Sequence, residues 1–272
     1  MIKVLAFNGS PRGKNGNTEK ILQPFLEGMS EAGASAEILY LKDLSIRECL
    51  GCYACHMRTP GICAIKDDME WVLEKMMSTD IIVFATPLYV FTVSAYLKTL
   101  MDRMMILGDL KIIVVNGRTA HPPRFPEKKW QWVLISNAGF PEKEHFGALE
   151  DTFERFANAF GGGTHVTLVG SILKGMGELF RVKALLPNFQ WFFDVCKQAG
   201  REVILDGCIS QKTQEILDRP LLDLPLEDLT SICNQYIEKA AQLLRKKNIG
   251  GKKYQKFAAK WLSSDAFPLL FP

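Results

Sequence analysis

Residues 2–29 read IKVLAFNGSPRGKNGNTEKILQPFLEGM, an apolar run followed by a loop of small residues and an amphipathic segment. Only Lys3 interrupts the apolar run, which is typical of a strand buried on both faces of a parallel sheet. Apolar residues then recur at helical spacing from Ile21 to Met29, and Pro24 is expected to bend this helix. The stretch therefore predicts a strand, a loop and a helix in direct succession, the opening of an α/β fold.

The loop between this strand and this helix is suited to binding a phosphate. A helix N-terminus presents unpaired N–H groups and the positive end of its dipole, so an anion is stabilised there. Candidate contacts are the hydrogen-bonding Ser10, Asn17 and Thr18, the flexible Gly16 and the cationic Arg12. We expect Thr18 to cap the helix. The alternative is a surface turn that happens to precede a helix, since neither of the two commonest nucleotide-binding glycine motifs is present.

The composition is that of a chain with one sizeable core. Its 272 residues are 47% hydrophobic and carry a formal net charge of +3, which argues neither for nor against a polyanionic partner, so any basic surface must be local. We expect no nucleic-acid partner. No apolar run has the length of a membrane span, and the N-terminus does not resemble a secretion signal. We therefore expect a cytoplasmic protein without membrane association. The basic residues after position 244 are better explained as a solvated helix face than as a patch for nucleic acid or anionic lipid.

Further apolar runs of strand length alternate with amphipathic segments along the chain. The expected strands cover residues 35–41, 81–85, 132–135 and 165–169. This alternation predicts a flavodoxin-like, doubly wound five-stranded parallel sheet ordered 2-1-3-4-5, with a ligand crevice where strands one, three and four end. Residues 104–129 break the pattern, and we interpret them as an insertion beside the site with a short strand at 112–115.

Beyond residue 170 the pattern is helical. The expected helices cover residues 187–205, a segment ending at 217, and residues 226–246. We therefore divide the chain into an α/β domain of residues 1–175 and a helical C-terminal extension of residues 176–272 packed on the same domain. Packing or oligomer contacts are the interpretation for Phe189, Trp191, Phe192 and Phe193. Small buried apolar residues are the interpretation for Cys196, Cys208 and Cys233.

Four of the seven cysteines lie in one loop, residues 49–63. Two residues separate Cys49 from Cys52 and Cys52 from Cys55, and seven residues, with a turn at Pro60, separate Cys55 from Cys63. Four thiolates from such a loop suit an iron–sulfur cluster or a structural zinc ion. Three cysteines in close succession favour the cluster, while zinc and free or redox-paired thiols remain alternatives. We interpret His56, which lies inside this loop, as a surface residue.

Several motifs of this sequence resemble those of one group of flavoproteins. They are the loop from Gly9 to Thr18, the segment Ala85-Thr86-Pro87-Leu88-Tyr89 with Leu97-Lys98 and Met101-Asp102-Arg103 after it, and the segment of residues 136–142. These motifs resemble the FMN loops of the flavodoxin-like NAD(P)H-dependent FMN reductase and iron–sulfur flavoprotein family. The spacing of the four cysteines is similar to the compact motif of the iron–sulfur members.

The resemblance implies a set of binding residues. It implies contacts to FMN from Ser10, Arg12, Gly16, Asn17, Thr18, Pro87, Leu88, Tyr89, Val90, Asn137, Ala138 and Gly139. It implies a [4Fe–4S] cluster on Cys49, Cys52, Cys55 and Cys63, the choice that the spacing also favours. No catalytic side chain is expected, because the cofactors carry the electron chemistry.

The resemblance also implies an activity. We expect an FMN-dependent oxidoreductase that passes electrons from NAD(P)H or reduced ferredoxin, through FMN and the cluster, to a small-molecule or protein acceptor. Members of such families form homodimers or homotetramers. Two alternatives remain open: a cluster-free NAD(P)H:FMN or quinone reductase, and a non-enzymatic flavin electron carrier or redox sensor.

Overall fold

The computed structural model describes residues 1–246, which fall into two compact units. The first contains Met1–Gly177 and Trp191–Arg219, and the second contains Glu178–Gln190 and the chain from Pro220 onward. Each unit is described by itself. The basic residues expected on a solvated helix face are mostly beyond 246 and lie outside the described residues. The predicted division after residue 175 stays a prediction.

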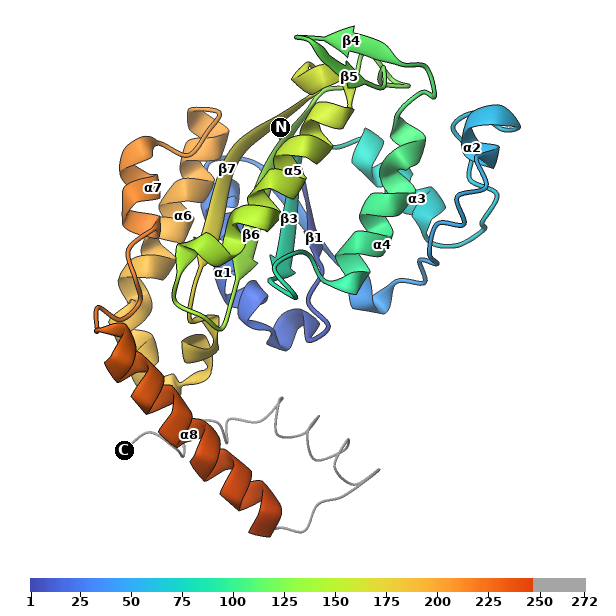
Figure 1. Cartoon of the computed structure of the whole chain (residues 1–272). Coiled ribbons are helices and arrows are strands. Elements are labelled where there is room, and N and C mark those ends of the chain that lie inside the picture. The colour runs from blue at the N-terminus through green and yellow to red at the C-terminus, as the bar shows by residue number, and fades with distance from the viewer. Residues whose placement is uncertain (247–272) are drawn as a thin grey trace. The chain divides into compact units, whose positions relative to one another are not determined.

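The first unit is built on a five-stranded parallel sheet (Figure 1). Its strands are β1 (Lys3–Asn8), β2 (Ser35–Tyr40), β3 (Ile81–Pro87), β6 (Trp130–Asn137) and β7 (Val166–Lys174), in the order β2-β1-β3-β6-β7. The flavodoxin-like order predicted from the sequence is thereby confirmed. β7 extends five residues beyond its predicted end because it pairs along the whole of β6, with a register irregularity after Trp132.

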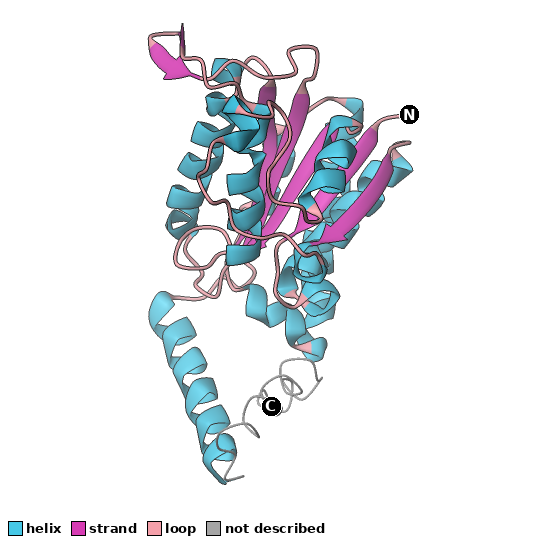
Figure 2. Ribbon diagram, turned by 90° about the vertical axis from the view of Figure 1, so that its right-hand side faces the viewer, coloured by secondary structure: helices cyan, strands magenta, loops and turns pink. Residues whose placement is uncertain are grey.

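Helices cover both faces of this sheet (Figure 2). One face packs against α1 (Asn17–Glu31) and α6 (Gln190–Leu205), and the other against α3 (Met69–Met77), α4 (Ala95–Arg103) and α5 (Gly147–Ala159). Strands β1, β3 and β6 are therefore buried almost throughout, which explains their nearly continuous apolar sequences. Phe84 lies in one of these cores, with its ring centroid 5.9 Å from Phe7 and 4.9 Å from Trp132.

α1 and α6 approach each other more closely than side chains would allow. A Cβ atom added at Gly28 would lie 1.8 Å from the carbonyl oxygen of Lys197, and one at Gly200 would lie 2.0 Å from that of Phe25. Glycine at both positions lets the two backbones touch. α6, apart from its first residue, and the following α7 (Gln211–Leu217) consequently belong to the same compact unit as the sheet.

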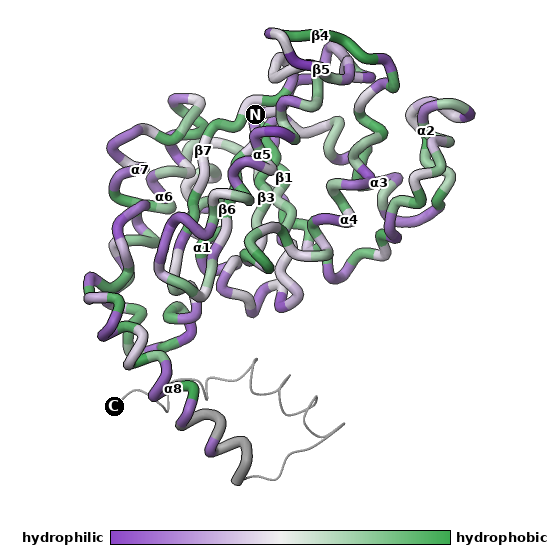
Figure 3. The backbone as a smooth tube through the Cα atoms, in the orientation of Figure 1, coloured by the Kyte–Doolittle hydropathy of each residue, from purple (hydrophilic) through white to green (hydrophobic). Residues whose placement is uncertain are grey.

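The insertion contains an antiparallel hairpin of β4 (Ile113–Val115) and β5 (Arg118–Ala120), which confirms the short strand expected there. Its position differs from the prediction. The hairpin packs on the 3-10 helix Gly161–Gly163, which precedes the start of β7, and so lies at the amino end of the sheet (Figure 1). β4 is strongly hydrophobic (Figure 3), yet Val114 is 72% exposed.

Three local expectations are corrected by the structure. Thr18 does not cap α1, because Gly16 is the N-cap residue and the Thr18 hydroxyl instead accepts a hydrogen bond from Asn137. Cys208 and Cys233 are exposed, whereas Cys196 is buried as expected. Cys208 lies in the turn between α6 and α7, and Cys233 lies on an exposed part of α8 (Leu226–Lys246).

The second unit contains α8 and two 3-10 helices, Gly177–Arg181 and Lys183–Phe189. Phe180 and Phe189 are buried with ring centroids 6.1 Å apart, which confirms a packing role for Phe189. The boundaries of α8 are those predicted from its sequence. None of the helices within residues 1–246 combines the length and the apolar character that a membrane crossing requires.

Candidate functional site

The loops that follow β1, β3 and β6 meet at the carboxyl edge of the sheet, as predicted. These three strands are neighbours, so their ends are side by side. Backbone hydrogen bonds join the loops directly: the Gly9 N–H donates to the Ala85 carbonyl at 2.7 Å, and the Leu88 N–H donates to the Asn137 carbonyl at 2.8 Å. The sheet thus brings together the three groups of residues predicted to form one site.

The first loop folds tightly around Ser10, which is 3% exposed. The Ser10 N–H donates to Asn8 Oδ1 at 2.8 Å, and the Ser10 hydroxyl accepts from the N–H of the half-buried Arg12 at 3.2 Å. A Cβ atom at Gly16 would lie only 2.5 Å from Ser10 Oγ. Glycine is therefore required at this position if Ser10 is to keep its place.

The start of α1 fits an anionic ligand. Gly16 has no side chain to cap the helix, so the first N–H groups of α1 are left for a ligand or water. Asn17 and Thr18 are buried beside them. The Oδ1 atom of Asn17 has no hydrogen-bond partner among the described residues, and neither has the buried hydroxyl of Ser136 at the end of β6. Buried polar atoms of this kind are normally satisfied, so the edge has hydrogen-bonding capacity for a polar ligand.

A buried hydrogen-bond network behind the loop was not predicted from the sequence. The Glu19 carboxylate, 6% exposed, accepts hydrogen bonds from Asn8, Gln23 and Tyr40, each at 2.7 Å. Burial and the hydrogen bond to Glu19 raise the pKa of Tyr40, so its hydroxyl remains a donor. Because Asn8 also accepts a hydrogen bond from the Ser10 N–H, this network helps to fix the conformation of the first loop. Glu19 in the first turn of a helix was the available signal, since a carboxylate is stabilised there.

The second loop contains a strained turn. Tyr89 and Thr92 exchange two backbone hydrogen bonds of 3.0 and 3.1 Å, which makes Val90 and Phe91 the corner residues. Their φ values are 48° and 63°, in the left-handed region that a β-branched or aromatic side chain rarely adopts. Such conformations cost of order 1–3 kcal/mol each and concentrate at functional sites. Val90 is 90% exposed at this corner.

Ser94 ties the second loop to the first. It is the N-cap of α4, where its hydroxyl accepts from the Leu97 N–H at 3.3 Å and donates to the Gly9 carbonyl at 2.6 Å. Its own N–H donates to Thr86 Oγ1 at 3.0 Å. This role of Ser94 was not predicted from the sequence, because it depends on a residue 85 positions away.

The third loop completes the edge. The Asn137 side chain donates to Thr18 Oγ1 at 2.8 Å, and the Ala138 N–H donates to the Lys174 carbonyl at 3.0 Å. Gly139 is exposed, and a Cβ atom there would meet nothing within 4 Å. Beyond it, the exposed Phe140 lies against His145 with centroids 5.0 Å apart, and Phe91 approaches the same ring at 5.6 Å. An aromatic surface therefore borders the second and third loops.

The four cysteines predicted to bind metal lie in one loop but do not surround a common point. Cys49 and Cys52 are exposed, and Cys55 and Cys63 are half-buried around the short helix α2 (Ala54–Met57). Within residues 1–246 no three side chains of His, Cys, Asp or Glu are placed to hold a metal ion. Burial, followed by the nearby Cys63, raises the pKa of the Cys55 thiol.

His56 is more constrained than a surface residue. Its Nδ1 atom lies 3.1 Å from Nη2 of Arg124, which also donates to the Gly108 carbonyl at 3.0 Å. Burial and the Arg124 charge lower the pKa of His56. The insertion therefore contacts the cysteine loop instead of the carboxyl edge of the sheet.

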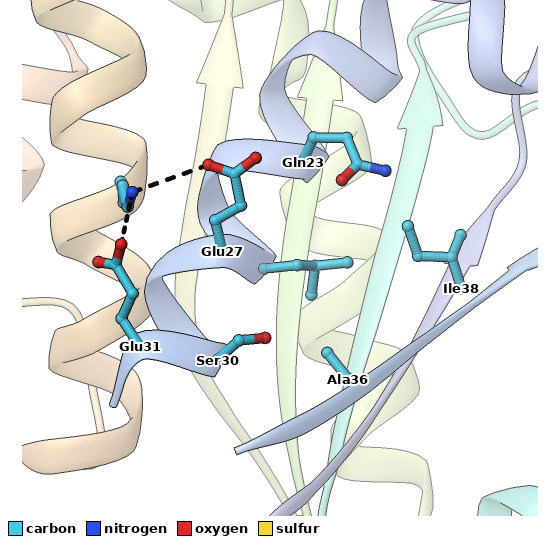
Figure 4. A pocket seen from close by; sticks show the side chains of 8 residues that line it. Gln23, Glu27, Ser30, Glu31, Ala36 and Ile38 are labelled. Atoms are coloured by element: carbon cyan, nitrogen blue, oxygen red, sulfur yellow. Dashed lines mark ion pairs between the residues drawn. The ribbon is translucent and has the colours of Figure 1, made fainter. Parts of the chain in front are cut away.

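Two hollows of the first unit lie away from the carboxyl edge. One, of about 400 Å³, lies between α1, β2 and α6 and is bordered by the ion pairs of Lys197 with Glu27 and Glu31 (Figure 4). It faces the C-terminal half of α1, away from the N-terminus of that helix. The other, of about 420 Å³, has an apolar lining from α3 and the insertion and includes Cys63.

Comparisons with known proteins agree with the motifs of the first half of the chain. Residues 2–122 match the model of the family described as NADPH-dependent FMN reductase. An iron-sulfur flavoprotein of Archaeoglobus fulgidus is 45% identical over 113 residues, 41% of this chain and 54% of that protein. The iron-sulfur flavoprotein MJ1083 of Methanocaldococcus jannaschii is 39% identical over 102 residues, 38% of this chain and 51% of that protein. The chain thus spans about half the length of these curated relatives.

The fold has solved counterparts. The FMN-dependent NADH-azoreductase of Bacillus anthracis superimposes with a TM-score of 0.54 at 15% identity, covering 75% of this chain and all of that one. At this identity the likeness concerns the fold alone, which is the flavodoxin-like sheet described above. The family match and the motifs at the carboxyl edge agree with the resemblance seen in the sequence: residues 2–122 of this chain are similar to the NADPH-dependent FMN reductase family.

Proposed function

We propose that this protein is an FMN-dependent oxidoreductase that takes electrons from NAD(P)H or reduced ferredoxin and delivers them to a small-molecule or protein acceptor. The main observation behind this proposal is that the start of α1 has no side-chain cap. It lies at the carboxyl edge of the sheet, where hydrogen bonds join the first loop to two further loops. The match of residues 2–122 to the family model and the names of the relatives support the same activity. By resemblance, we further propose a cytoplasmic homodimer or homotetramer.

The residues at the edge fit the parts of FMN. In this proposal the phosphate is held by Ser10, Arg12, Gly16, Asn17 and Thr18, and the ring system by Pro87, Leu88, Tyr89, Val90, Asn137, Ala138 and Gly139. The α1 N-terminus and the Arg12 guanidinium supply positive charge for the phosphate. The unpartnered Asn17 and Ser136 oxygens supply hydrogen-bonding capacity for a polyhydroxylated chain.

Bound FMN would supply both two-electron and one-electron exchange, which no side chain of this site can. The protein's own residues bind, orient and shield. Asn8 and Glu19 keep the Ser10 loop in place, Ser94 holds that loop against the second loop, and the aromatic border limits access of water. No acid or base at the edge is required in this scheme.

In the finer form of the proposal, Cys49, Cys52, Cys55 and Cys63 hold a [4Fe–4S] cluster that supplies one-electron transfer. The four-thiol donor set and the iron–sulfur names of the relatives support it. The competing candidate is a cluster-free NAD(P)H:FMN or quinone reductase. The observation in its favour is that, within the described residues, no three of these thiols are placed to hold a metal ion.

The deciding experiment is anaerobic purification followed by a visible spectrum and assays of iron, sulfide and zinc. We expect flavin bands and about four iron atoms per chain, as four cysteine ligands to a cubane imply. Flavin with zinc, or with no metal, would contradict the cluster and leave the two-electron reductase. Rapid NAD(P)H oxidation by a quinone would exclude a carrier without turnover, whereas absence of flavin binding would refute the whole proposal.

A further inference from the structure

Arg103, the last residue of α4, is buried in an ion pair with Asp67. The two side chains are 2% and 3% exposed. Two parallel contacts join them, from Nη1 to Oδ2 at 2.8 Å and from Nη2 to Oδ1 at 3.0 Å. This two-pronged geometry fixes the orientation of both side chains.

The Arg103–Asp67 pair is hydrogen-bonded to the chain on both sides of the cysteine loop. At the first end, Arg103 Nη1 donates to the Arg47 carbonyl at 2.7 Å, and the Arg47 N–H donates to Asp67 Oδ2 at 2.9 Å. At the second end, Asp67 itself follows Cys63 by four residues and supplies the other half of the pair. Asp67 Oδ1 also accepts from the Met69 N–H at 3.1 Å, which attaches the pair to the start of α3.

Because both side chains are buried, the loss of these contacts would be costly. Taking an arginine and an aspartate out of water costs several kcal/mol each, which is recovered only with good geometry and further hydrogen bonds. Here the additional bonds go to the backbone on both sides of the cysteines. The ion pair therefore forms together with the closed loop, and a loop that opened would lose the backbone hydrogen bonds that compensate the burial of the two charges.

The opposite end of α4 belongs to the proposed flavin site. Ser94 caps the helix and holds the Gly9 carbonyl of the first loop, while Arg103 holds the cysteine loop nine residues later. A helix of this length spans about 13 Å. The helix is thus a rigid connection between the loop proposed to bind phosphate and the loop that contains the four cysteines.

We propose that Arg103, together with Asp67, is the positioning residue that closes the cysteine loop onto α4 before any metal binds. It sets the separation between Cys49 and Cys63 and the distance of both from the carboxyl edge. The inference rests on the proposed function only in naming a cluster as what the loop holds. The closure itself is a property of the folded chain.

The test is hydrogen–deuterium exchange of the full-length, FMN-loaded chain, measured as isolated and after removal of iron by a chelator. In the Arg103→Gln variant we expect peptides covering residues 44–66 to exchange roughly 100-fold faster, because one partner of a buried pair is lost. Peptides of β1 and β3 should exchange at the wild-type rate. Arg103→Lys keeps the positive charge but loses the two-pronged contact with Asp67, so its cysteine loop should exchange at a rate between those of the wild type and Arg103→Gln.

Two further variants make the result specific. Asp67→Leu combined with Arg103→Met removes both charges, so the core stays folded while Arg47 loses its partners, and loop exchange should still rise. Arg155→Gln removes an exposed arginine from its pair with Asp151 and should leave the loop unchanged. Wild-type exchange of the loop in the double variant would overturn the inference. Fast loop exchange in a protein whose wild type binds no iron would support the closure and refute only the cluster.

Discussion

At the scale of single residues, Lys174 is a titratable group buried in the core of the first unit. It is 3% exposed, and its Nζ atom donates to the carbonyls of Leu217 and Arg219, the latter at 2.7 Å. The same atom lies 4.5 Å from the Phe192 ring centroid. Burial lowers the pKa of Lys174 to about 8. The lysine thus closes the C-terminal end of α7 at the cost of a buried charge.

This burial predicts a pH dependence of stability. Between pH 8 and the ordinary lysine pKa of 10.5, the unfolded chain keeps a proton that the folded chain has lost, so unfolding takes up a proton. The free energy of unfolding should therefore rise with pH across this window, by up to roughly 3 kcal/mol. Urea denaturation of the wild type and of Lys174→Met at several pH values measures it. Equal slopes for the two proteins would contradict the assignment to Lys174.

At the scale of elements, the junction of the first loop with α1 depends on one glycine. Ser10 occupies the space that any side chain at position 16 would need. The residues around the junction are close in sequence, so a candidate phosphate-binding loop could be predicted from the sequence alone. That Thr18 does not cap α1 could not be predicted from this segment, because the Thr18 hydroxyl accepts a hydrogen bond from Asn137 of another strand.

Gly16→Ala should weaken FMN binding by roughly tenfold or more, because the new methyl group pushes Ser10 out of its position. Fluorescence titration of FMN measures the loss. Gly147→Ala is the matched control, since a Cβ atom at this start of α5 meets nothing within 4 Å. The control should bind FMN as the wild type does and be slightly more stable. Equal affinities for the two variants would argue against a ligand at this loop.

At the scale of the whole molecule, the contact between α1 and α6 joins segments about 170 residues apart into one core. Sequence analysis predicted both helices but not their contact. Glycine inside a helix is unfavourable by itself, and only the neighbouring backbone explains why two of them are present. The same holds for the insertion, whose strand was predicted correctly and whose place beside the cysteine loop was not.

Gly200→Ala should lower the free energy of unfolding by roughly 3 kcal/mol or more, because its Cβ atom would lie 2.0 Å from a carbonyl oxygen that cannot move alone. Chemical denaturation measures the change. Arg201→Ala, on the same helix pair, breaks only an exposed ion pair with Glu31 and should cost less than about 1 kcal/mol. Similar losses in both variants would show that the two helices separate more easily than their contact implies.

The sequence by itself determined the local elements, the order of the five strands and the presence of four cysteines in one loop. These follow from the periodicity of apolar residues and from the spacing of special residues, which each segment carries on its own. Only the tertiary structure decided that Asn137 reaches Thr18, that α6 touches α1, and that Arg103 and Asp67 close the cysteine loop. Such contacts join distant segments, and the sequence pattern of one segment does not specify which surface of another segment it will meet.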